Sequence, residues 1–85
     1  MRRFKWIAWN IAKVHAHGLS VEEVEASFDS VYSLVERDDS SFQMFAKTPS
    51  GRFIWVIWRY DIINEGFPDI FADLEDASVF VITAY

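Results

Sequence analysis

The sequence contains no cysteine, and it has two prolines and three glycines among its 85 residues. Without thiols, neither a disulfide nor a thiolate-bound metal can hold the fold together, and a cysteine nucleophile is excluded. No segment approaches the run of about 18 apolar residues that crosses a bilayer, and residues 1–6 are not followed by the apolar stretch of a signal peptide. We therefore expect a cytoplasmic protein that makes no use of the membrane.

Basic residues are also scarce, since eight lysines and arginines stand against 13 aspartates and glutamates, for a net charge of −5. This balance argues against an extended nucleic-acid surface, because phosphate binding depends on Lys and Arg. Six of the acids fall within residues 61–76, which contain no Lys or Arg, so the rest of the chain holds eight basic and seven acidic residues. The acidity is local, and we interpret 61–76 as an acidic loop or insertion.

Apolar residues are plentiful by comparison. They make up 52% of the chain, and 18% of all residues are aromatic, including four tryptophans and eight phenylalanines. A chain of this length buries only about 60–65% of the surface that its unfolded form exposes, so its core must be dense. We expect a single domain over residues 1–85 in which aromatic side chains supply much of the core.

Two short helices are predicted in the first third of the chain. Asn10 is a favoured N-cap residue, and Gly18 stands where a helix running to His17 would end in a left-handed residue. The segment 20–23, Ser-Val-Glu-Glu, fits a capping box, in which the serine and the second glutamate bond each other's backbone N–H groups. Apolar residues then recur at spacings of three and four along 21–28, as in an amphipathic helix that faces a core.

Strands are predicted for the rest of the chain. Four runs of β-forming residues lie at 31–35, 42–47, 52–60 and 79–83, with turns at 38–41 and 48–51. The run 52–60 is the most apolar, which favours a central strand, and alternation places Arg52 and Arg59 on opposite faces of it. The pattern predicts an α+β fold in which two N-terminal helices pack on a three- to four-stranded antiparallel sheet.

Three motifs of this chain occur in the same order in a known family. The segment Trp9-Asn10…His17-Gly18-Leu19-Ser20-Val21-Glu22-Glu23-Val24 resembles the W-(D/N)…HG-(V/L)-(S/T)-x-E-E-(A/V) signature of BrnT-like toxins. The segment Thr48-Pro49-Ser50-Gly51-Arg52-Phe53, followed by Val56-Ile57, resembles the T-x-x-G-R-x-L…V-V hairpin of that family. The segment Val81-Ile82-Thr83-Ala84 resembles its closing I-(S/T)-A-R strand. The resemblance covers most of the chain.

The resemblance implies a RelE-like ribonuclease fold and a place in a bacterial type II toxin–antitoxin pair. It implies a metal-independent endoribonuclease that acts on RNA and is neutralised by a cognate, BrnA-like antitoxin. In the family, the closing strand continues into a C-terminal helix that carries Arg, Glu and Tyr, whereas here Tyr85 takes the place of the strand's arginine and is the last residue. We therefore expect a reduced catalytic site.

Candidate site residues follow from the chemistry that the resemblance implies. Cleavage needs a base for the 2′-hydroxyl, cations for the developing charge on the phosphate, and an acid for the leaving oxygen. The catalytic candidates are Arg52, Arg59, His17 and Tyr85, and the RNA-binding candidates are Lys13, Lys47 and Trp9. We expect no cofactor. We also expect no metal, because His15 and His17, two apart on a helix, point to different sides.

Each candidate also has a purely structural interpretation. His17 can cap the end of its helix, where a cationic imidazole meets the negative end of the helix dipole. Arg52 follows a turn glycine and can start a strand while pairing with an acid. The tryptophans belong in the core, with at least one of Trp55 and Trp58 buried and only Trp9 placed for exposure.

A second functional hypothesis follows from these structural interpretations. The chain is then a catalytically degenerate BrnT-fold module that acts through protein–protein interaction, using the edge of its sheet or the acidic loop. Apolar residues within 61–76 need a surface to pack on, which this domain, a partner or a second copy in a homodimer would supply.

Overall fold

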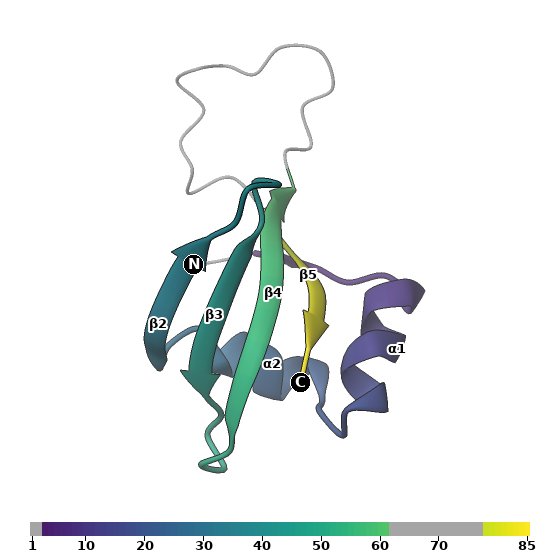
Figure 1. Cartoon of the computed structure of the whole chain (residues 1–85). Helices are drawn as coiled ribbons and strands as arrows, with labels where there is room; N and C mark the ends of the chain where they lie inside the picture. Colours follow the sequence, from purple (N-terminus) through teal and green to yellow (C-terminus); the bar gives the residue numbers. More distant parts are fainter. Residues whose placement is uncertain (1–2, 62–77) are drawn as a thin grey trace.

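The fold of this chain is a single twisted sheet with two helices, and it is described here from a computed structural model for residues 3–61 and 78–85 (Figure 1). The elements, in order, are β1 (Phe4–Lys5), α1 (Ala8–Ala16), α2 (Val21–Ser27), β2 (Val31–Glu36), β3 (Phe42–Lys47), β4 (Phe53–Asp61) and β5 (Ser78–Ala84). The two helices and the four longer strands fall where the sequence predicts them, within one or two residues at most ends. The predicted acidic loop, apart from Asp61, lies outside the described residues.

The strands pair in the order β1-β5-β4-β3-β2, which makes β4 the middle strand, as its apolar run predicts. All pairings are antiparallel except that of β1, which runs parallel to β5 with Phe4 opposite Val79 and Lys5 opposite Phe80. The expectation of a three- to four-stranded antiparallel sheet was therefore wrong in detail, because the described sheet has five strands and is mixed. A strand of two residues has no periodicity to detect, and only β5, at the other end of the chain, makes it a strand.

The helix boundaries follow the capping chemistry, with one correction. Ser20 caps α2 through a bond from the Glu23 N–H at 3.1 Å, and the Glu23 carboxylate accepts the Ser20 N–H at 3.2 Å, so the predicted capping box is confirmed. Gly18 has a φ of +74°, the left-handed conformation expected after α1. Asn10 does not cap α1, which already begins at Ala8 after Ile7. Its Oδ1 instead accepts the Ile7 N–H at 2.7 Å, the part that a glutamate plays in a capping box.

The core lies between the sheet and the helices. Figure 1 shows α2 behind the sheet and α1 beside β5, and the contacts of α1 are mainly with β5. The helices contribute Val14, Leu19, Val24 and Phe28, and the sheet contributes Met44, Ala46, Ile54, Val56, Trp58, Val79, Val81 and Ala84. Trp58 is buried, whereas Trp9 is about half exposed, and both outcomes confirm the predictions for the tryptophans. The Trp6 Nε1–H donates to Glu25 at 2.7 Å and thereby ties the start of the chain to α2.

Asn10 connects three elements from inside this core. Its side chain is fully buried, and its Nδ2 donates to the carbonyl of Lys5 at 3.0 Å and to the carbonyl of Val81 at 2.9 Å. Together with the bond from the Ile7 N–H, one amide satisfies backbone groups of the β1–α1 connection and of β5. These bonds hold α1 against the edge of β5.

We predict that Asn10→Leu destabilises the protein by about 2–4 kcal/mol, because the apolar side chain leaves buried backbone carbonyls without a donor. Denaturant unfolding followed by tryptophan fluorescence measures this change. His15→Leu is the matched control, because His15 is exposed on the same helix, and its effect should stay within about 0.5 kcal/mol. Equal effects of the two substitutions would show that Asn10 does not hold the helix in place.

Candidate functional site

Three of the predicted catalytic residues meet at one corner of the fold, where α1 ends, β4 begins and β5 ends. The Arg52 guanidinium donates from Nη2 to the carbonyl of His17 at 2.9 Å and from Nη1 to the carbonyl of Gly18 at 3.4 Å. The imidazole of His17 lies against the ring of Tyr85, with the ring centroids 5.9 Å apart. All three side chains are exposed. We call His17, Arg52 and Tyr85 the corner cluster.

Local structure explains the position of Arg52. The turn before β4 closes with a bond from the Thr48 N–H to the Arg52 carbonyl at 2.8 Å and one from the Arg52 N–H to Thr48 Oγ1 at 3.1 Å. Gly51 has a φ of +92°, a conformation that L side chains rarely adopt. The turn therefore places Arg52 just before β4, with its side chain directed to the end of α1.

Tyr85 joins the corner through the backbone of β4. The Trp55 N–H donates to the Tyr85 carbonyl at 2.8 Å, and the Tyr85 N–H donates to the Trp55 carbonyl at 2.9 Å. This pair continues the β4–β5 ladder by one residue beyond Ala84, so the phenol ring is fixed next to both Trp55 and His17. The ring itself is 46% exposed.

Arg59 does not belong to the corner cluster. Arg59 follows Arg52 by seven residues, so at the usual rise of a strand the two residues lie about 23 Å apart. Its guanidinium lies over the ring of Phe80, 4.9 Å from the centroid, and Trp9 stacks on Phe80 at 6.2 Å. Lys13 in turn lies over Trp9 at 5.2 Å. Arg59 is thus grouped with the two RNA-binding candidates of α1 around the buried ring of Phe80.

The sheet face opposite α2 carries further aromatic rings, and we call it the open face. Alternation directs the even-numbered side chains of β4 into the core and its odd-numbered ones to this face. Phe53 stacks on Phe45 at 5.3 Å and contacts Tyr32 at 5.4 Å, and Phe45 contacts Trp55 at 4.8 Å. Phe53 and Tyr32 are 50% and 62% exposed. These rings lead across the sheet to the corner cluster.

Lys47, the remaining RNA-binding candidate, lies on the same face, with its Nζ 5.4 Å from the centroid of Phe53. Lys47 was a candidate from the sequence, but Tyr32, Phe45 and Phe53 were not expected at the surface, because aromatic residues of strands usually lie in the core. The alternation of Phe45 and Phe53 with buried Met44, Ala46 and Ile54 was the signal that could have found these two, whereas Tyr32 lies where the β2–β3 pairing is irregular.

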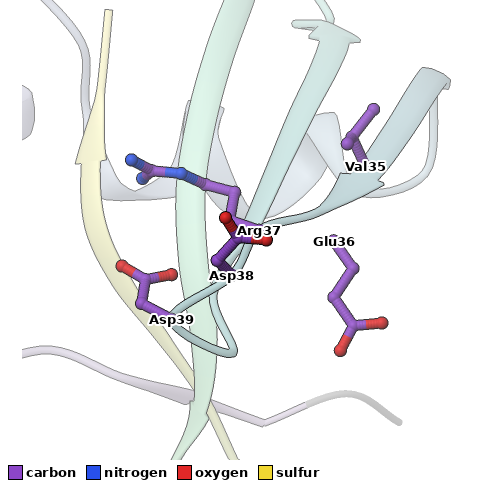
Figure 2. Close-up of a pocket in the computed structure, with 5 residues that line it drawn as sticks. All are labelled: Val35, Glu36, Arg37, Asp38 and Asp39. Atoms are coloured by element: carbon purple, nitrogen blue, oxygen red, sulfur yellow. The ribbon is translucent and has the colours of Figure 1, made fainter.

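A shallow pocket lies at the turn between β2 and β3, lined by Val35, Glu36, Arg37, Asp38 and Asp39 (Figure 2). In Figure 2 the Arg37 side chain points away from that of Glu36. Both the hydroxyl and the backbone N–H of Ser41 donate to Asp39 Oδ1. These bonds hold the pKa of Asp39 below its usual value of 3.8, and the bond from the hydroxyl has the larger effect. Within the described residues, no cluster of three His, Asp or Glu side chains could hold a metal ion.

We predict that the Asp39 carboxyl titrates below pH 3.8, and that Ser41→Ala moves its pKa back toward that value. Because folding lowers this pKa, the stabilisation of the turn is complete above pH 3.8 and is lost as the pH falls through the lower, folded value. A pH titration of the carboxyl carbon by NMR measures both points. Ser50→Ala serves as the control and should leave the Asp39 pKa unchanged.

Arg52 should also stabilise the end of α1 through its bonds to the carbonyls of His17 and Gly18. We predict that Arg52→Met lowers the free energy of unfolding by about 1 kcal/mol, since both bonds to the end of α1 are lost from an exposed position. It should also speed hydrogen exchange of the Leu19 amide, which bonds to the Val14 carbonyl at that helix end. Arg37→Met, which removes a guanidinium elsewhere, is the matched control. The same exchange rate in both variants would contradict this role.

Comparison with protein-family models, curated proteins and solved structures finds no match for this chain. Within the described residues, no helix is long and apolar enough to span a membrane. The corner cluster and the open face are therefore the observations from which a function can be inferred.

Proposed function

We propose that this chain is a metal-independent endoribonuclease, the toxin component of a bacterial toxin–antitoxin pair, with the corner cluster as its catalytic site. The observation that carries the proposal is the meeting of His17, Arg52 and Tyr85, which come from three distant parts of the sequence. They supply an imidazole, a guanidinium and a phenol, the three kinds of group that cleavage of RNA without a metal requires.

The roles follow from the chemistry of each group. His17 takes the proton of a ribose 2′-hydroxyl, whose oxygen then forms a bond to the adjacent phosphorus. Arg52 uses two N–H groups on the end of α1, and its remaining N–H groups bind the phosphate oxygens as charge builds on them. Tyr85 gives a proton to the 5′-oxygen as the bond from phosphorus to that oxygen breaks. The products are a 2′,3′-cyclic phosphate and a 5′-hydroxyl, and no metal or water takes part.

The open face provides a path along which single-stranded RNA can reach this corner. Exposed aromatic rings stack on unpaired bases, whatever their sequence, and Lys and Arg contact the phosphates between them. Trp55 is paired through its backbone with Tyr85, so a base on the open face lies next to the proposed acid. Lys47 and Arg59 supply cations at two places on the face.

The positions of the acidic residues support RNA binding on the open face and not on the face that α2 covers. The acids of α2, Glu22, Glu23 and Glu25, belong to the helix that packs on the opposite face of the sheet. RNA is therefore directed to the open face despite the net charge of −5. The resemblance to BrnT-like proteins adds a cognate antitoxin as the partner that would block this activity.

A second function, that of a degenerate interaction module, is favoured by one observation at the same corner. The Arg52 guanidinium already bonds two backbone carbonyls, as a residue with a structural role does. In that case the chain binds a partner protein and catalyses no reaction. The two functions differ in whether the imidazole of His17 takes part in a reaction.

We predict that the purified chain cleaves a labelled single-stranded RNA in the presence of a metal chelator, and that His17→Ala lowers the rate about 100-fold or more. His15→Ala is the matched control, because it removes an exposed imidazole from the same helix, two residues away. Tyr85→Phe, which deletes only the hydroxyl, should slow cleavage and preserve RNA binding. Gel analysis of the products should show the cyclic phosphate end.

Three results would count against the ribonuclease. These are the absence of cleavage, equal cleavage by the His15 and His17 variants, and cleavage that the chelator abolishes. RNA binding without cleavage, measured by fluorescence anisotropy, would instead assign the chain to the interaction module.

A further inference from the structure

The outer edge of β2 is the most exposed apolar feature of the sheet. β2 is the last strand in the sheet order, and all six of its residues are exposed. Four of them are large and apolar: Val31, Tyr32, Leu34 and Val35 are 42%, 62%, 53% and 59% exposed. An edge of this kind presents unpaired backbone groups that can accept another strand.

Proteins usually prevent further strands from pairing with such edges, and the opposite edge of this sheet is protected in this way. There, β1 has two residues, and α1 follows directly beside β5. β2 contains neither proline nor lysine, the residues that commonly block added strands. Its pairing with β3 is irregular between Val31 and Ser33, so the run from Ser33 to Glu36 remains regular.

The hydrogen-bond pattern identifies the available groups. The Arg37 N–H donates to the Ser41 carbonyl across the β2–β3 ladder. In an antiparallel pair, the residues that bond to the neighbour alternate, so Val35 and Ser33 also bond to β3. The backbone groups of Leu34 and Glu36 then point outward, away from β3.

Charge decides which strand fits. Residues 29–39 carry four acids, Asp29, Glu36, Asp38 and Asp39, against one cation, Arg37, which leaves a net charge of −3, and the Arg37 side chain points away from that of Glu36 (Figure 2). A second copy would bring together two edges that each have a net charge of −3, which disfavours a homodimer at this edge. A strand flanked by Lys or Arg would meet opposite charge at both ends.

We propose that the β2 edge is a docking site for an extended, basic segment of another protein, which adds as a further strand beside Leu34 and Glu36. Its affinity comes from main-chain hydrogen bonds and its selectivity from the acidic residues that flank the edge. The inference does not rest on ribonuclease activity, because β2 is the outermost strand and β3 separates it from β4 and from the corner cluster.

The test uses the 85-residue chain, labelled with ¹⁵N, and two synthetic peptides. Both peptides alternate valine and threonine, and one is flanked by lysines and the other by glutamates. We expect the basic peptide to bind about tenfold more tightly at low ionic strength and to weaken as salt is added. Binding should shift the amide signals of Leu34 and Glu36 and protect them from exchange.

Two variants separate the contributions. Glu36→Lys combined with Asp38→Lys should reverse the preference, so that the acidic peptide binds more tightly. Leu34→Pro removes an outward N–H without removing a β2–β3 bond and should abolish binding of both peptides. Tryptophan fluorescence, to which the buried Trp58 contributes with the three other tryptophans, checks that each variant is folded.

The proposal is overturned by equal binding of the two peptides, by no binding of either peptide to the folded wild-type chain, or by shifts confined to α1 and β5. It is also overturned if light scattering shows that the chain alone forms a dimer that β2 substitutions dissolve. None of these results bears on RNA cleavage, so failure here is distinct from failure of the proposed function.

Discussion

The buried amide of Asn10 is the contact on which the arrangement of this fold depends. A carboxamide with no access to water must have its donors and acceptor satisfied, and here they are satisfied by the backbone of Lys5, Ile7 and Val81. Lys5 and Ile7 precede α1 in the sequence, and Val81 lies near the other end of the chain. The amide therefore fixes α1 beside β5, with consequences for every residue at the end of that helix.

The corner cluster is one of those consequences. Because α1 is held beside β5, its last residues lie next to the end of that strand, and His17 meets Tyr85. Arg52 reaches the same point from the other direction, because the turn before β4 ends at that side of the sheet. An imidazole, a guanidinium and a phenol are thus assembled by packing rather than by any one local motif.

The sheet is covered unequally, and this asymmetry separates its surfaces chemically. α2 and its glutamates lie on one face, while the open face carries aromatic rings, with Lys47 over the exposed Phe53 and Arg59 over the buried Phe80. The β2 edge is a third surface, apolar in its strand and acidic at its flanks. One small domain therefore offers surfaces suited to ligands of opposite charge, which net charge alone does not reveal.

Local chemistry let the sequence by itself determine the two helices and the four longer strands of this fold. The capping box at Ser20, the left-handed Gly18 and the apolar run of β4 each depend on a few neighbouring residues, and each is found where it was predicted. The motif residues likewise pointed to His17, Arg52 and Tyr85 as candidates.

Tertiary structure decided what no local pattern contains. The two residues of β1 become a strand only through β5, and Asn10 became a buried bridge because its partners are distant in sequence. Packing also grouped Arg59 with Phe80 and Trp9 rather than with Arg52. Neighbours along the chain constrain backbone conformation, whereas the meeting of distant side chains depends on how the whole chain excludes water from its core.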